Sequence, residues 1–285
     1  MNASISKNII IAPETDSAPL AGKVVWWDLS GSVPLHTFNE ALTAAGFGEA
    51  WHAAQPRLGL RLERSLKRVA ARDELVRPAR AQDGMVLVGE GADADGRNSY
   101  EVGLRVWVTP LTGGEELHFS DPDHPKVEAI REAFAHYSNT LTSRDISAWL
   151  TAAVRTVRAV ALRANGGYYF VPVVHLGLWE RVLDVVRSCT HHEFYDLPAH
   201  TQATAIRSVL KAIEAEAEAA IAGVESKLQG GMSRRGLRGR ESELETLTKK
   251  LMDYETSLGV TLGAVRERAD KLKNAVAEQL LLEDD

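Results

Sequence analysis

This sequence has one cysteine, no long apolar run and no excess of positive charge. Cys189 is the only cysteine, so the chain cannot form an internal disulfide, which favours a reducing compartment. No apolar run approaches the roughly 18 residues that a membrane-spanning helix needs, and Ile9–Ile11 is too short for the core of a signal peptide. The 33 Lys and Arg are outnumbered by 39 Asp and Glu, giving a net charge of −6, which argues against coating nucleic acid through bulk charge. We therefore expect a cytoplasmic protein that has no membrane partner.

The usual catalytic and cofactor-binding motifs are also missing. The sequence has no Gly-x-x-x-x-Gly-Lys-Ser/Thr loop, no Gly-x-Ser-x-Gly elbow, no His-Glu-x-x-His helix and no Cys-x-x-Cys pair. We therefore expect no cofactor and favour a non-enzymatic function. The rival hypothesis is a metal-dependent hydrolase or nuclease built from side chains of metal-ligand and general-base types. Its residues are His175, His191 and His192, joined by Asp184 or Glu193.

The composition and the order of local patterns predict an α+β fold. Hydrophobic residues make up 45% of the chain and charged residues 25%, as in ordinary globular proteins. We expect a mixed helix and short-sheet N-terminal and central part, followed by a long antiparallel helical hairpin. Met85–Gly89 and Tyr100–Thr109 have strand character and predict a β-hairpin. The predicted parts are a flexible arm over 1–23, an α/β subdomain with that hairpin over 24–120, a mixed α/β subdomain over 121–200 and the helical hairpin over 201–285.

The last third of the chain has the pattern of two long helices. Residues 201–229 are almost all helix formers, a Gly-rich segment at 230–240 interrupts them, and a second helix is predicted from Glu241 to near Leu282. Apolar residues in the second helix recur in steps of three and four with one stutter, as in a coiled coil. This apolar seam either folds back on the first helix or zips against a second copy, and we expect it to mediate oligomerisation. Its residues are Leu244, Leu247, Leu251, Tyr254, Leu258, Leu262, Val265 and Leu272.

A row of arginines marks the helix predicted over Arg57–Arg72. The apolar residues Leu58, Leu62, Leu66 and Val69 form one buried stripe, while the arginines recur in steps of four, three, four and four. Because this arginine row lies to one side of the stripe, we expect it to be exposed or at a boundary and able to follow phosphates. The alternative is a solvated face whose arginines pair with nearby carboxylates. The row consists of Arg57, Arg61, Arg64, Arg68 and Arg72.

A second basic cluster lies at the tip of the predicted hairpin, in the Gly-rich segment 230–240. A tip loop far from the core is well placed to contact nucleic acid, an acidic partner or an anionic surface. A solvated connector that tolerates charge is the alternative. The tip cluster consists of Arg234, Arg235, Arg238 and Arg240.

Two runs, Leu141–Leu150 and Leu162–Pro172, carry a family resemblance together with the later Pro198-Ala199 step. The second run holds an arginine, a double glycine and a Tyr-Phe-Val-Pro strand. These features resemble an uncharacterised family of proteins from bacteriophages and other prokaryotic mobile elements, over about residues 24–227. The resemblance implies no activity, cofactor or catalytic residue. It implies a phage or mobile-element accessory protein that acts in the host cytoplasm.

Together these patterns predict a non-enzymatic, oligomerising assembly protein that contacts nucleic acid or another anionic partner through its arginine clusters. The expected partners are a second copy of the chain and nucleic acid. A different binding role is an adaptor for an ATPase or other protein machine, with the helical hairpin as its lever. A virion structural protein is a further alternative that the long helices permit.

Overall fold

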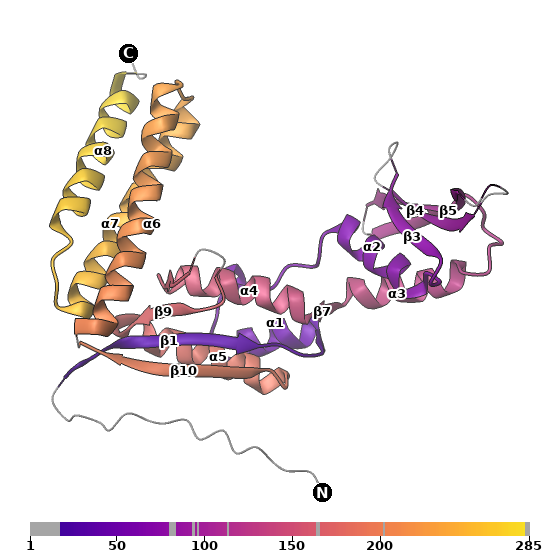
Figure 1. Ribbon diagram of the computed structural model, residues 1–285, viewed down its shortest axis with the longest axis horizontal. Helices are drawn as coiled ribbons and strands as arrows, with labels where there is room; N and C mark the ends of the chain where they lie inside the picture. The colour runs from indigo at the N-terminus through magenta and orange to yellow at the C-terminus, as the bar shows by residue number, and fades with distance from the viewer. Residues whose placement is uncertain are drawn as a thin grey trace, which may run out of the picture. The chain divides into compact units, whose positions relative to one another are not determined.

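The computed structural model describes residues 18–79, 84–92, 95, 97–112, 114–163, 166–201 and 203–282. Its helices and antiparallel sheets confirm the predicted α+β class (Figure 1). The described chain divides into two compact units that are built from interleaved segments. Unit 1 comprises the described residues within 1–28, 152–182 and 193–285, and unit 2 those within 29–151 and 183–192. The predicted boundaries at 120 and 200 do not coincide with the boundaries of these units.

The start of the described chain is a strand. Of the flexible arm predicted over residues 1–23, residues 1–17 lie outside the described residues. Leu20–Lys23 instead open strand β1. The arm prediction is therefore wrong for these four residues, because Leu20 pairs with β10, and Gly22 and Lys23 pair with both β10 and β9.

Unit 1 contains a four-stranded antiparallel sheet in the order β10-β1-β9-β8. Strand β1 is rich in β-branched and aromatic residues, which favour a pleated and largely buried surface. It pairs with β10 as far as Asp28, which lies opposite Glu193. Gly22 allows β9 to approach closely, because a Cβ at this position would lie 2.2 Å from the carbonyl oxygen of Val171. The strands are β1 (Leu20–Asp28), β8 (Val160–Ala161), β9 (Tyr169–Pro172) and β10 (Glu193–His200).

Three helices lie side by side in unit 1, where the sequence predicted two (Figure 1). They are α6 (Ala203–Gln229), α7 (Arg234–Leu258) and α8 (Gly263–Leu282). Helix α7 stops at Gly259, which adopts the left-handed conformation with a φ of 65° and caps the helix. The continuous helix predicted from Glu241 to Leu282 is therefore wrong. Gly259, Val260 and Thr261 all have low helix propensity, which explains the break.

The apolar seam is buried inside this three-helix bundle. Its five residues on α7 are at most 6% exposed, and α6 contributes Ile213, Ala217 and Ile221 to the same cluster. Val265 and Leu272 of α8 are partly buried against that cluster. The chain thus fills the seam with its own side chains, and a long two-helix coiled coil is not formed. A coiled coil with a second copy needs exposed apolar side chains, and the seam residues on α7 are buried within the chain.

Helices cover both faces of the sheet in unit 1. On one face, Val24 and Phe170 pack in the cluster that contains the buried residues of α6 and α7. On the other face, Trp179 of α5 (Leu176–Cys189) packs against Trp27, with ring centroids 6.3 Å apart. A sheet covered on both faces needs apolar residues at consecutive positions, as β1 has.

Unit 2 is built around a second four-stranded antiparallel sheet, in the order β3-β4-β5-β6. Helices α2 and α3 cover one of its faces (Figure 1). The apolar stripe predicted on α2 is confirmed, since Leu62 and Leu66 are buried in one cluster with Leu104 and Val106 of β5. The predicted β-hairpin is confirmed as β4 and β5. The elements are α2 (Leu58–Val69), β3 (Glu74–Pro78), β4 (Gly84–Ala92), β5 (Asn98–Leu111), β6 (Gly114–Phe119) and α3 (Val127–Ser138).

The remaining elements are short or connect the segments of the two units. The strands β2 (Ser32–Pro34) and β7 (Thr140–Thr142) pair with each other, and two 3₁₀ turns lie at η1 (Glu49–Trp51) and η2 (Val173–His175). The further helices are α1 (Leu35–Ala44) and α4 (Ser143–Thr156). Helices α4 and α5 contribute residues to both units. None of the helices in the described part of the chain is long and apolar enough to cross a bilayer.

Candidate nucleic-acid interface

The arginine row predicted on α2 divides into buried and exposed members. Arg61 is only 3% exposed and donates to both carboxylate oxygens of Glu115, at 2.6 and 2.7 Å. It also donates to the hydroxyl of Ser138 at 2.9 Å and lies over the ring of Phe134. These hydrogen bonds from Arg61 hold the pKa of Glu115 below its ordinary value. The prediction that Arg61 is exposed or at a boundary is wrong, because α3 and β6 pack over this part of α2.

Arg64 is held in a second ion pair. Its guanidinium donates to the two carboxylate oxygens of Asp145 at 2.7 and 3.0 Å, and the backbone and hydroxyl of Thr142 donate to the same carboxylate. Burial alone raises the pKa of Asp145, but the hydrogen bonds from Arg64 and Thr142 outweigh burial and leave that pKa lowered. A bidentate arginine pair of this kind is a structural contact and is not free to bind phosphate.

The other members of the arginine row remain exposed. Arg57, Arg68 and Arg72 have no ion-pair partner among the residues that the structure describes. Only these three of the five predicted residues are therefore placed to meet an anionic partner.

The tip cluster is helical rather than a loop. Ser233 caps α7 by accepting a hydrogen bond from the backbone of Gly236, so all four predicted arginines lie in the first two turns of the helix. Arg235 and Arg238 are exposed, while Arg240 pairs with Glu243. The predicted Gly-rich loop over 230–240 shrinks to four residues, because Ser233 is a strong N-cap.

The histidines of the hydrolase hypothesis belong to different units. In unit 1, His175 contacts Asp253 at 2.8 Å, and Arg158 pairs with the same carboxylate. In unit 2, His192 is buried and its Nδ1 accepts a hydrogen bond from the backbone of Ser30. Burial, and then the charge of the neighbouring His191, lower the pKa of His192. Across the described residues, no group of three His, Cys, Asp or Glu side chains is arranged to hold a metal ion.

The face of the unit 2 sheet that α2 and α3 leave uncovered carries a set of residues that the sequence analysis missed. Along β5, Leu104, Val106 and Val108 are buried, so the alternating residues Arg105 and Trp107 point to the opposite face. Cross-strand partners share a face, which places further residues of β3, β4 and β6 beside them. We call this surface the open face, and its central residues are Arg77, Tyr100, Arg105, Trp107 and His118.

The open face combines an aromatic stack with two arginines. The rings of Trp107 and His118 stack with centroids 5.5 Å apart and planes at 20°, and Trp107 is partly exposed. Arg77 and Arg105 flank Val86 on its two sides across the strands, and Val86 is buried between them. Neither arginine has an ion-pair partner among the described residues.

The carboxylates on the open face contact residues other than the two arginines. Glu116 lies 3.7 Å from His118, and Glu90 accepts from the hydroxyl of Tyr100 at 3.3 Å. Among the described residues neither Glu116 nor Glu90 pairs with Arg77 or Arg105, so the two guanidinium groups are available to an external anion. The sequence signal for this surface is the run of residues 104–108. Aliphatic residues alternate there with Arg105 and Trp107.

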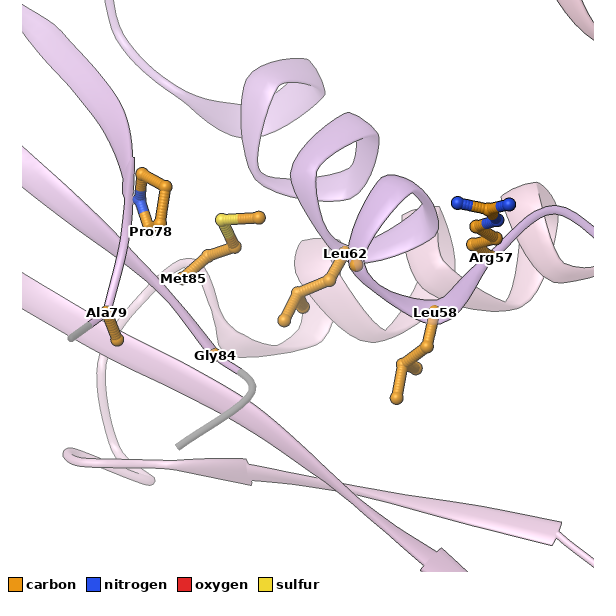
Figure 2. A pocket seen from close by; sticks show the side chains of 8 residues that line it. Arg57, Leu58, Leu62, Pro78, Ala79, Gly84 and Met85 are labelled. Carbon is orange, nitrogen blue, oxygen red and sulfur yellow. The ribbon is translucent and has the colours of Figure 1, made fainter. Parts of the chain in front are cut away.

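Unit 2 also has an apolar pocket between the start of α2 and strands β3 and β4 (Figure 2). It measures about 420 Å³, and Leu58, Leu62, Pro78 and Met85 line it. Of the described residues that line it, only Arg57 is charged (Figure 2). Its described lining is otherwise apolar, which is the chemistry of a site for an apolar group.

The chain matches the model of a family of unknown function, DUF6744, over residues 20–284. No curated protein and no solved structure matches the chain significantly.

Proposed function

The chain therefore belongs to a family whose function is unknown, and from its geometry we propose that it is a non-enzymatic protein that binds single-stranded nucleic acid through the open face of unit 2. One observation carries the proposal. A partly exposed, stacked Trp107 lies on the same sheet face as two arginines, Arg77 and Arg105, that have no ion-pair partner among the described residues.

The open face has the two components that single-strand binding requires. Aromatic side chains on a sheet provide ring faces for bases, and arginines beside them contact phosphates. Trp107 has His118 on one side and Gly84, which carries no side chain, as its cross-strand partner on the other. A base can therefore stack on the side of Trp107 that faces β4. A duplex hides its base faces, so we expect single strands to bind more tightly.

The local arrangement of charge explains how an acidic protein can bind a polyanion. The net charge of −6 gives no general attraction for nucleic acid. Arg77 and Arg105 nevertheless lie on one surface. The two carboxylates of that surface contact His118 and Tyr100 and do not pair with these arginines. Two phosphate contacts of this kind predict modest affinity with a shallow salt dependence.

The test is fluorescence anisotropy with labelled single- and double-stranded DNA and RNA of equal length, at 50 and 200 mM salt. With two phosphate contacts, affinity for single strands should fall about sevenfold between these salt concentrations. The double variant Arg77→Glu/Arg105→Glu should abolish binding, and Trp107→Ala should weaken it at least tenfold, a loss that base stacking accounts for.

The matched control reverses two arginines of the α2 row. Arg57→Glu/Arg68→Glu makes the same change in net charge on a different surface and should leave affinity within about twofold. If the α2 control lost binding and the open-face variant kept it, the arginine row would be the interface. If no oligonucleotide bound even at 50 mM salt, the proposal would fail, and a protein partner such as an ATPase would become the better hypothesis.

We also propose a phage or other mobile genetic element as the setting of the protein, with the host cytoplasm as its place of action. The support is the resemblance carried by the Leu162–Pro172 run and the Pro198-Ala199 step. In such a setting, transient single strands during replication or packaging are the expected ligands.

A further inference from the structure

A ladder of stacked aromatic rings lies in unit 1. Trp26 of β1 and Tyr195 of β10 are cross-strand partners, and their rings are nearly parallel, at 13°, with centroids 5.5 Å apart. On its other side Trp26 contacts Tyr168, with centroids 5.6 Å apart. The guanidinium of Arg163 lies 5.4 Å from the centre of the Tyr168 ring. We call these four side chains the aromatic ladder.

The two ends of the aromatic ladder differ. Arg163 closes one end by a cation–π contact with Tyr168. The other end is Tyr195, which lies on β10, the edge strand of the sheet. Among the described residues, no ring or cation stacks on the outer side of Tyr195. Among the described residues the stack of rings therefore ends at Tyr195, which is partly exposed.

The charges around the open end favour a cation. Asp28 and Glu193 lie directly opposite each other on the face that carries Trp26 and Tyr195, and both are exposed. Like charges in such a cross-strand pair repel each other. Neither carboxylate has an ion-pair partner among the described residues. The Tyr195 hydroxyl donates to Glu193, and this hydrogen bond, followed by burial and then the charges of Glu193 and Asp28, raises the pKa of Tyr195. The same carboxylates would repel a phosphate.

We propose that the open end of the aromatic ladder is a docking site for an arginine side chain of a partner protein. The guanidinium stacks on Tyr195, as Arg163 stacks on Tyr168 at the closed end, and it pairs with Glu193 and Asp28. Arginine fits better than lysine because its flat group can stack and donate to carboxylates at the same time. The proposal is independent of nucleic-acid binding, since it uses other residues in the other unit.

The experiment measures the anisotropy of fluorescein-labelled Arg-Gly-Ser repeat peptides with the full-length protein. The matched peptide replaces each arginine with citrulline, which keeps the shape of the side chain and removes its charge. We expect the arginine peptide to bind at least tenfold more tightly than the citrulline peptide. Tyr195→Leu and Glu193→Gln should each weaken binding of the arginine peptide about tenfold.

Two further variants separate loss of the site from loss of the fold. Tyr195→Phe keeps the ring and should retain affinity within about threefold. Tyr137→Leu removes another partly exposed tyrosine, in α3 of unit 2, and should leave the affinity for the arginine peptide unchanged. Equal binding of the arginine and citrulline peptides, or unchanged affinity of Tyr195→Leu, would overturn the proposal. A single-stranded oligonucleotide that loses more affinity in Tyr195→Leu than in Arg77→Glu/Arg105→Glu would also overturn it and make the ladder a base-binding site.

Discussion

The two four-stranded sheets have the same number of strands and the same antiparallel pairing, yet the chain covers them differently. In unit 1, helices pack on both faces, so Val24 and Phe170 on one face and Trp27 on the other all lose exposure. In unit 2, helices pack on one face only, and Val102 on the open face stays 52% exposed. The difference indicates where a partner can bind. On the open face no helix packs against the aromatic residues, so packing within the chain does not explain them.

The units also differ in how they keep charges out of water. In unit 2 the buried cation is Arg61, which forms a bidentate pair with Glu115. In unit 1 the buried cation is Lys250, which donates to the backbone carbonyl of Ala159 at 2.8 Å and to Glu216 at 2.6 Å. Burial lowers the pKa of Lys250 against the opposing effect of Glu216. Unit 2 thus satisfies a buried arginine with one bidentate carboxylate, whereas unit 1 satisfies a buried lysine with a carboxylate and a backbone carbonyl.

The largest expected effect comes from the doubly covered sheet. Phe170→Ala removes a fully buried ring and should lower the free energy of unfolding by about 3–5 kcal/mol, measured by urea denaturation. Val102→Ala on the open face is the matched change and should cost no more than about 0.5 kcal/mol. A loss above 2 kcal/mol of unfolding free energy for Val102→Ala would mean that the open face is covered. That result would contradict the difference between the two sheets.

The next effect is the acid sensitivity of unit 2. The folded-state pKa of Asp145 is lowered, so its stabilisation is present above the unfolded pKa, near 4, and is lost as pH falls through the folded value. Asp145→Asn should therefore be less stable than wild type by about 1.5–3 kcal/mol at pH 7, because it loses hydrogen bonds between charged groups. At a pH below both pKa values the two proteins should converge in urea denaturation. A constant gap at all pH values would show that the ion pair with Arg64 is not its source.

The smallest of the three effects concerns the lysine of unit 1. Lys250→Ala leaves the Ala159 carbonyl without its donor and should cost about 1–3 kcal/mol of unfolding free energy. The neighbouring Lys249, whose side chain is 54% exposed in a pair with Glu245, supplies the control, and Lys249→Ala should cost less than about 0.5 kcal/mol. Equal losses in the two variants would mean that Lys250 contributes only as much as a surface charge.

Local patterns were sufficient to predict several elements. The spacing of Leu62 and Leu66 identified the buried side of α2, and the strand character of Met85–Gly89 and Tyr100–Thr109 identified the hairpin of β4 and β5. The break after α7 was missed because Leu258, Leu262 and Val265 continue the coiled-coil steps across it. The spacing of apolar residues hid the poor helix propensity of the residues between them.

Long-range pairing accounts for the misplaced arginines. Arg61 and Arg64 find their carboxylates 54 and 81 residues later in the chain, so no local pattern could tell them from the exposed Arg68. The open face was within reach of sequence analysis, since Arg105 and Trp107 alternate with buried residues. The aromatic ladder was not, because its rings come from three distant segments.

The pairing of β1 with β10 has a consequence for how the protein is made. Asp28 meets Glu193 only after about 165 further residues have been synthesised, which takes roughly 10–30 seconds at ordinary rates of synthesis. During that time the apolar strand β1 has left the ribosome without its edge partner, while most of unit 2 is already complete. Unit 2 can therefore fold first, and β1 must stay out of aggregates until β9 and β10 have left the ribosome. Slow, non-local pairing of this kind makes nascent chains clients of chaperones.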